Sequence, residues 1–132
     1  MSLIDGIGGA FLFSNNPKGL AEWYRENLGM NYDESPDCSS IYKAFSYRDL
    51  NDASIERTTT WAILRSDSDI QGKPRTGQIN YRVKSMNEVL SHLRAKGVNI
   101  EKTEDCEYGK FAWLTDPDGN KIELFEEAST PA

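Results

Sequence analysis

The chain has 132 residues, with 21 acidic and 15 basic side chains and a formal net charge of -6. This length suits one folding unit with a real core. The acidic balance, without any Lys/Arg cluster, argues against binding to nucleic acid or to an anionic membrane. No apolar run approaches the roughly 20 residues of a membrane span, and the N-terminal residues lack the basic region of a secretory signal. With two isolated cysteines, Cys38 and Cys106, the sequence predicts a cytoplasmic protein.

The first regular unit reads as a strand followed by a helix. Residues 9–14 are rich in aromatic and apolar side chains, as is typical of a strand. Asn16 supplies an N-cap with Pro17 at the first helical position, and Gly29 can adopt the left-handed backbone that ends a helix. The apolar residues between them recur at helical spacing and predict one buried side: Leu20, Trp23, Tyr24 and Leu28.

The second half of the chain repeats this unit. Residues 78–84 form a predicted strand, Ser85 is a predicted N-cap with Glu88 completing a capping box, and Gly97 ends the helix. The buried stripe of this helix is predicted at Met86, Val89, Leu90 and Leu93. Because the strand-to-glycine spacing is nearly the same in both halves, the sequence indicates an internal duplication.

Short strand candidates follow each helix. They are a faint one at 30–32, then 41–47 and 58–64 in the first half, and 98–102, 111–115 and 121–125 in the second. Each half therefore reads βαβββ, which predicts an α+β fold. We expect one domain over residues 1–132, with module 1 at about 5–65, a polar linker at 66–77 and module 2 at about 78–127.

The sequence resembles one known family. The strand before "NNPKGLAEWYRENLGM", the later "INYRV" and "LRAKGV", and above all "WLTDPDGNKIELFE" are similar to the glyoxalase/bleomycin resistance/dioxygenase group, the vicinal oxygen chelate superfamily. The resemblance implies two βαβββ modules in tandem, forming a curved mixed sheet around a central cup with the helices on the outer face. It also implies a homodimer and a small-molecule ligand in the cup.

The resemblance further implies where a metal would bind. Metal-using members hold a divalent ion on His, Gln or Glu side chains from the first and last strands of each module. Glu123 and Gln78 match two of these positions, but the others fall on Gly9, which has no side chain, and on 58–64, which contains no His, Asp or Glu. A catalytic divalent site normally has about three protein ligands. We therefore expect no metal cofactor, with Zn, Ni, Mn or Fe as the alternative.

The single histidine does not complete such a site. His92 lies in the second predicted helix among its buried positions, and the helical period places it toward solvent.

Strand alternation predicts which side chains would face the cup. Gln78, Asn80 and Arg82 share one face of their strand, and Glu123 points the same way from the last strand. The candidate aromatic walls are Phe11, Phe13, Trp61, Phe111 and Trp113. A mostly apolar pocket with a few convergent polar groups is typical of a small-molecule site. In the structural alternative, Arg82 and Glu123 simply neutralise each other.

Three functions remain open from the sequence. The first is a metal-free small-molecule-binding protein of the bleomycin-resistance type, holding an aromatic or cationic ligand. The second is a metal-dependent lyase, isomerase or dioxygenase that uses Glu123 as a ligand. The third is a metal-free enzyme in which Glu123 transfers a proton on a carbonyl substrate.

Overall fold

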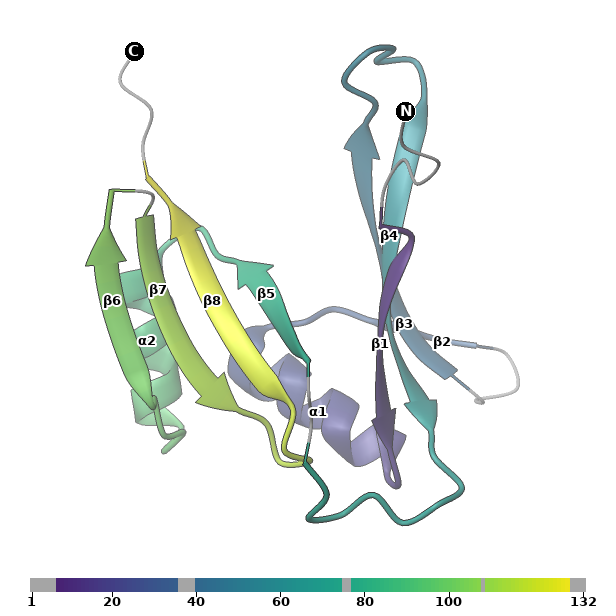
Figure 1. Ribbon diagram of the computed structural model, residues 1–132, viewed down its shortest axis with the longest axis vertical. Helices are drawn as coiled ribbons and strands as arrows, with labels where there is room; N and C mark the ends of the chain where they lie inside the picture. Colours follow the sequence, from purple (N-terminus) through teal and green to yellow (C-terminus); the bar gives the residue numbers. More distant parts are fainter. Residues whose placement is uncertain (1–6, 36–39, 75–76, 108, 129–132) are drawn as a thin grey trace. The chain divides into compact units, whose positions relative to one another are not determined.

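The computed structural model describes residues 7–35, 40–74, 77–107 and 109–128, and they form an α+β fold of two tandem βαβββ modules (Figure 1). The first module contains β1 (Gly9–Ser14), α1 (Pro17–Leu28), β2 (Asp33–Glu34), β3 (Ser40–Arg48) and β4 (Glu56–Arg65). The second contains β5 (Gln78–Arg82), α2 (Met86–Ala95), β6 (Lys102–Cys106), β7 (Gly109–Thr115) and β8 (Lys121–Glu127). Neither described helix is long and apolar enough to cross a membrane.

The chain divides into two compact units, and the division falls inside α1. The first unit comprises Met1–Ala21 and Asn31–Asp69, and the second comprises Glu22–Met30 and Ile70–Ala132. Each unit contains one four-stranded mixed sheet, in the order β1-β4-β3-β2 in the first and β5-β8-β7-β6 in the second. The cup expected between the two sheets stays a prediction.

The first sheet has its core on one face. β1 runs parallel to β4, while β3 is antiparallel to both β4 and β2. The register aligns Leu12, Ile63 and Ile41 in one row across three strands, and all three side chains are buried. Alternation places Phe11 and Phe13 on the opposite face, where both are about half exposed.

The β3–β4 hairpin continues past the start of β1 as a two-stranded ribbon, seen at the upper end of Figure 1. β1 pairs with β4 only from Thr60 onward, whereas the β3–β4 pairing extends to Arg48 and Glu56. We call residues 45–59 the arm. All of its residues except Asp49 and Thr59 are exposed.

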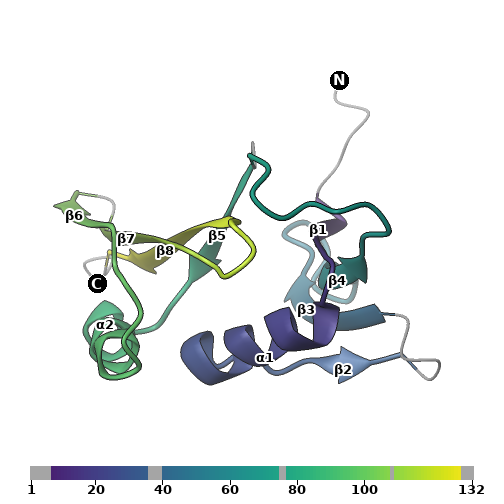
Figure 2. The same ribbon diagram turned by 90° about the horizontal axis from the view of Figure 1, so that it is seen from below.

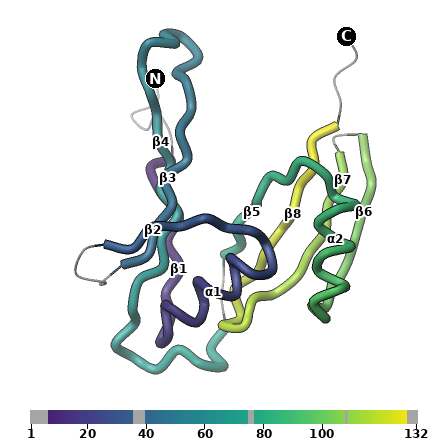
Figure 3. The backbone as a smooth tube through the Cα atoms, turned by 180° about the vertical axis from the view of Figure 1, so that it is seen from behind, coloured from purple at the N-terminus to yellow at the C-terminus, as the bar shows by residue number. Residues whose placement is uncertain are grey.

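In the second unit, α2 covers one face of the sheet, and Figures 2 and 3 show it alongside the strands from two directions. The helix contributes buried Met86, Leu90 and Leu93. The sheet contributes Ala112, Leu114, Ile122 and Leu124, all with at most 1% of their surface exposed. The face of β5, β8, β7 and β6 away from α2 is therefore free to carry polar side chains, and we call it the open face.

The ends of α2 confirm most of the expected capping signals. Ser85 Oγ accepts a hydrogen bond from Glu88 N at 3.3 Å, and Gly97, with φ of 76°, ends the helix. Gly97 N donates to Arg94 O and Val98 N to Leu93 O, which is the Schellman pattern. The described contacts contain no return bond from Glu88 to Ser85. Glu126 of β8 instead accepts from Met86 N at 2.7 Å, so a carboxylate satisfies the helix start from the neighbouring sheet.

The turn of the DPDGN segment is built around the buried carboxylate of Asp116. Its Oδ1 accepts from the backbone N–H groups of Asp118 and Asn120, both at 2.9 Å. Its Oδ2 accepts from Asn120 Nδ2 at 2.8 Å and from the Tyr24 hydroxyl at 2.7 Å. Asp116 thus closes the turn with one oxygen and, through Tyr24, binds the turn to the second half of α1 with the other.

Two strand predictions need correction. The faint strand expected at 30–32 lies instead at β2, and the strand expected at 98–102 begins only at Lys102. β6 begins later than predicted because Val98 N still donates to Leu93 O in the last turn of α2. Ile100, which follows, is half-buried and lies outside the strand. All five residues of β6 are exposed at the edge of the sheet, so the strand carries no apolar alternation to reveal it.

Candidate functional site

The Glu123 carboxylate lies at the centre of a polar cluster on the open face. Its Oε1 accepts a hydrogen bond from Asn80 Nδ2 at 2.7 Å. Its Oε2 accepts from Gln78 Nε2 at 2.9 Å and from the indole Nε1 of Trp113 at 2.9 Å. All three partners are uncharged donors, and Glu123 itself is half-buried. The cluster thus holds a carboxylate in a fixed orientation without a cation.

The sheet register explains why these residues meet. Parallel pairing of β5 with β8 sets Asn80 beside Glu123, and antiparallel pairing of β7 with β8 sets Trp113 on the other side of it. Side chains that are partners in register lie on the same face of a sheet. Gln78 lies one row away on that face, two residues before Asn80, so its amide reaches the same carboxylate. Residues distant in the sequence are therefore positioned by backbone pairing alone.

An aromatic surface adjoins the carboxylate. The rings of Phe111 and Trp113 are stacked at 5.8 Å with 9° between their planes, and Phe111 also stacks on Phe125 at 4.9 Å. All three rings are half-buried. Lys102 of β6 places its Nζ 5.3 Å from the centroid of the Trp113 ring, a cation–π distance. The open face therefore combines a group of stacked aromatic rings, the hydrogen-bonded Glu123 carboxylate and the Lys102 ammonium group, which also lies 3.9 Å from Glu104.

Arg82 does not neutralise Glu123. Arg82 is the register partner of Phe125, whereas Asn80 is that of Glu123. The ion pairs found among the described residues do not include Arg82, and its side chain is exposed. The expected Arg82–Glu123 pair is thus not formed, and three neutral donors bind the carboxylate instead.

The aromatic candidates of the first unit do not share one face. Phe11 and Phe13 are 55% and 51% exposed on the face of the β1-β4-β3-β2 sheet opposite to its core. Trp61 is the register partner of Ala10, so it lies on the core face, and it is only 2% exposed. Trp61 is therefore a core residue, because alternation in β4 turns it away from the Phe11 side.

The residues at the implied metal positions do not fit a divalent site. No group of three or more His, Cys, Asp or Glu side chains that could hold an ion occurs in the described part of the chain. At Gly9 a Cβ atom would lie 2.7 Å from the Phe11 ring and 2.9 Å from Thr60 O, so the space where a ligand side chain would begin is filled. Two donors at Oε2 and one at Oε1 already hold the Glu123 carboxylate.

His92 is exposed on α2, as its helical position predicts. Its Nε2 lies 2.8 Å from Glu26 O, so it contacts the backbone of α1. His92 therefore contacts α1 and is not part of the Glu123 cluster.

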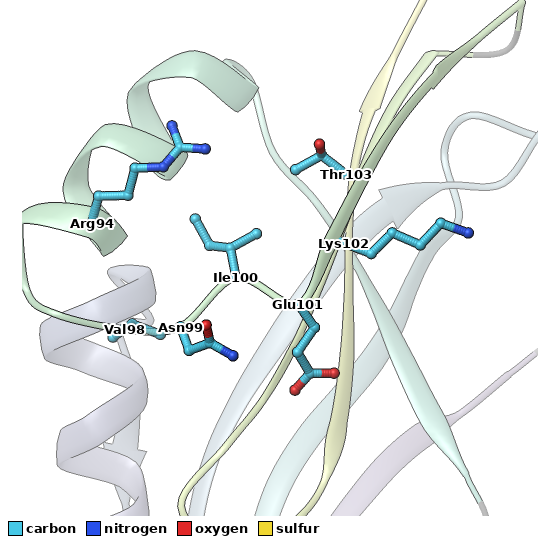
Figure 4. Close-up of a pocket in the computed structure, with 7 residues that line it drawn as sticks. All are labelled: Arg94, Val98, Asn99, Ile100, Glu101, Lys102 and Thr103. Atoms are coloured by element: carbon cyan, nitrogen blue, oxygen red, sulfur yellow. The ribbon is translucent and has the colours of Figure 1, made fainter.

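A surface depression of about 460 Å³ lies next to the C-terminal end of α2 and is lined by Arg94 and residues 98–103. Figure 4 shows Lys102 pointing away from Arg94 and Ile100, toward the other side of the sheet. None of the residues predicted to form the site lines this depression. The chemistry of the open face, and not this hollow, therefore defines the candidate site.

Sequence reasoning missed two parts of the site. Trp113 was expected as an aromatic wall, but its indole N–H also positions Glu123. Lys102 was not a candidate, because the strand that carries it was expected to end there. Its register partner is Trp113, so a correct boundary for β6 would have placed Lys102 on the open face.

A family model connects this architecture with known proteins. The model of the glyoxalase/bleomycin resistance protein/dioxygenase superfamily matches residues 6–124. The chain belongs to this superfamily. The glyoxalase-superfamily assignment confirms the resemblance seen in the C-terminal "WLTDPDGNKIELFE" and in the repeated strand–helix unit.

Solved structures of this superfamily share the fold at low sequence identity. A protein from Bacillus anthracis assigned to the glyoxalase family is 16% identical, with a TM-score of 0.69 and coverage of 97% of this chain and 99% of that one. A glyoxalase/bleomycin resistance protein/dioxygenase from Nocardioides is 14% identical, with a TM-score of 0.67 and coverage of 100% and 91%. Lactoylglutathione lyase from Agrobacterium tumefaciens is 12% identical, with a TM-score of 0.62 and coverage of 95% and 96%. Comparison with curated protein sequences finds no match.

Proposed function

We propose that this superfamily member binds a small organic ligand at Glu123 on the open face, without a resident divalent metal. The observation that carries the proposal is a half-buried carboxylate held by three uncharged donors beside a stacked aromatic surface. A carboxylate has about four acceptor positions, and three of them are used here. One position on Oε1 is left for a group of the ligand.

The chemistry of these neighbours favours an aromatic or cationic ligand. A ligand N–H or ammonium group would donate to Oε1 of Glu123, and an aromatic ring of the ligand would pack against the half-buried aromatic cluster of Phe111, Trp113 and Phe125. Lys102 contacts the same indole, so a ligand that stacks on Trp113 would displace its ammonium group or lie beside it.

The experiment is a thermal-shift screen of amines, amidines and aromatic carbonyl compounds, followed by titration of each hit against tryptophan fluorescence. A ligand that binds only the native state raises the melting temperature by mass action. We expect Glu123→Gln to weaken binding at least about tenfold, the equivalent of losing a charge-assisted hydrogen bond. The matched control is Glu127→Gln, which removes the same charge from the exposed end of β8. Equal affinity of both variants for every hit would refute a ligand site at Glu123.

A second candidate function is proton transfer by Glu123 on a carbonyl substrate. The free position on Oε1 favours it, since a general base needs an acceptor oxygen within reach of the proton. Solvent deuterium exchange into the α-carbon of carbonyl compounds, followed by NMR, tests this function separately from binding. We expect exchange to disappear in Glu123→Gln, and binding without exchange would leave the ligand-binding function alone.

We also propose that the protein is a cytoplasmic homodimer. The superfamily resemblance implies dimers, and the open edges of the two sheets support association, because unpaired strand edges offer backbone groups to a partner.

A further inference from the structure

We propose that the dimer forms by antiparallel pairing of the free edge of β3 with β3 of a second copy, centred on Ser46. This inference rests on the homodimer proposed above and names its surface, which we call the arm edge (Lys43–Asp49). It is independent of ligand binding at Glu123.

The arm exposes apolar side chains that its own unit does not cover. Phe45 is 36% exposed, Tyr47 49%, Ile55 40% and Leu50 99%. A two-stranded ribbon is at best marginally stable by itself in water. The arm, beyond the reach of β1, is such a ribbon, so pairing with another strand would stabilise it.

The tip of the arm is fixed by local hydrogen bonds. Asp49 Oδ1 accepts from the backbone N–H groups of Asn51 and Asp52, at 2.9 and 3.1 Å. Asp49 Oδ2 accepts from Arg57 Nε at 2.9 Å, and this hydrogen bond, with those from the two backbone N–H groups, lowers the pKa of Asp49. The tip thus holds Leu50 in an exposed position, and β3 keeps a regular extended edge up to Arg48.

The edge itself has no neighbouring strand in the described part of the chain. β4 occupies one side of β3, and on the other side β2 pairs only with Ile41 and Tyr42. The backbone from Lys43 to Arg48 therefore presents a row of donors and acceptors to a partner.

The sequence of the edge is complementary to itself. When two copies of "KAFSYRD" run antiparallel about Ser46, Phe45 lies opposite Tyr47 of the partner subunit, and Lys43 lies opposite the partner's Asp49. Lys43, Phe45 and Tyr47 share one face of β3, and Asp49 follows its last residue, so each dimer would gain two aromatic pairs and bring each Lys43 near an acidic residue of the other copy. A two-fold interface must be self-complementary in this way.

Charge complementarity identifies the occupant as a second copy. Lys43 takes part in none of the ion pairs of the described residues, although it is half-buried and would face an acidic group in the pairing. The exposed apolar side chains supply the buried area, and the flanking charges set the register.

Cysteine cross-linking tests the register. In a background with Cys38→Ser and Cys106→Ser, Ser46→Cys would place two Cα atoms about 4.5–5.5 Å apart across the two-fold axis, within disulfide reach. The control is Ala44→Cys, an exposed residue on the same face of the same strand. Its two copies would be displaced by about 13 Å along the strands. We expect a disulfide-linked dimer for Ser46→Cys only, and cross-linking of both variants or of neither would overturn the register.

Mass measurement separates this surface from the dimer itself. We expect Phe45→Glu/Tyr47→Glu to have a monomer mass by light scattering, with an unchanged circular dichroism spectrum because both residues are exposed. Ile7→Glu, an exposed apolar residue outside the arm, is expected to remain dimeric. If the double variant is still a dimer, the protein dimerises through another surface and the arm edge is not the interface. A monomeric unmodified protein at micromolar concentration would reject both.

Discussion

The indole N–H of Trp113 donates a 2.9 Å hydrogen bond to Oε2 of Glu123, across two adjacent antiparallel strands. The same ring stacks on Phe111 at 5.8 Å. Trp113 therefore joins the polar and aromatic halves of the open face, and changes at either residue are expected to affect the other.

Glu123→Gln is expected to reduce stability by about 1 kcal/mol. The amide has only one acceptor oxygen, and its NH₂ group must face at least one of the donors that now bind the carboxylate. Urea denaturation measures this change in the free energy of unfolding. The near-ultraviolet circular dichroism spectrum should change as well, because the indole of Trp113 loses its carboxylate partner. Gln78→Ala removes one of the three donors at an exposed position, so it should cost less than Glu123→Gln does. A larger loss for Gln78→Ala would contradict the central place of the carboxylate.

Tyr24→Phe is expected to destabilise the protein by about 1–3 kcal/mol, because it leaves Oδ2 of buried Asp116 with one donor fewer. Burial, followed by the proximity of Tyr81 and Asp116, raises the pKa of Tyr24. The hydroxyl thus stays protonated in the folded chain above pH 10, where the unfolded chain loses that proton.

The pH dependence of stability follows from this shift. Below about pH 10 the contribution of Tyr24 is complete, and above it the folding equilibrium constant should fall by about tenfold for each pH unit. Tyr24→Phe should show a shallower alkaline decline than the unmodified protein in urea denaturation between pH 9 and about pH 11. Parallel pH profiles of the two proteins would disprove the link to Tyr24.

Gly109→Ala is expected to cost about 3 kcal/mol or more. Gly109 has φ of 149°, and a Cβ atom there would lie against Glu126 O of the paired strand β8. Gly119→Ala is the matched comparison, since φ is 88° but no atom lies within 4 Å of its Cβ position. It should show only the backbone strain, about 1 kcal/mol. Similar melting temperatures for both variants would mean that β7 and β8 can separate to make room.

The dialysed protein is expected to carry no stoichiometric divalent metal. Two of the four implied ligand positions have no suitable side chain, and the Glu123 oxygens already accept three hydrogen bonds. Elemental analysis checks this directly. About one Zn, Ni, Mn or Fe per chain, lost in Glu123→Ala, would show that the expectation is wrong.

Much of the fold could be predicted because its signals are local. Asn16, Ser85, Gly29 and Gly97 mark helix ends through the conformations that their own residue types prefer. β6 could not be placed, because an exposed polar edge strand has no apolar period. The partners of Glu123 were grouped correctly by alternation, but the choice of Asn80 over Arg82 depends on a register between strands that are far apart in the sequence.

The Phe11 ring over Gly9 has a consequence for redesign. Because a Cβ atom at Gly9 meets both this ring and the backbone of Thr60, a histidine cannot be installed at that position by one substitution without displacing its surroundings. A metal ligand at residue 9 would therefore need two changes, a smaller side chain at Phe11 and a shift of β1 away from the Thr60 carbonyl. Variants that change the glycine alone are expected to be less stable than the unmodified protein.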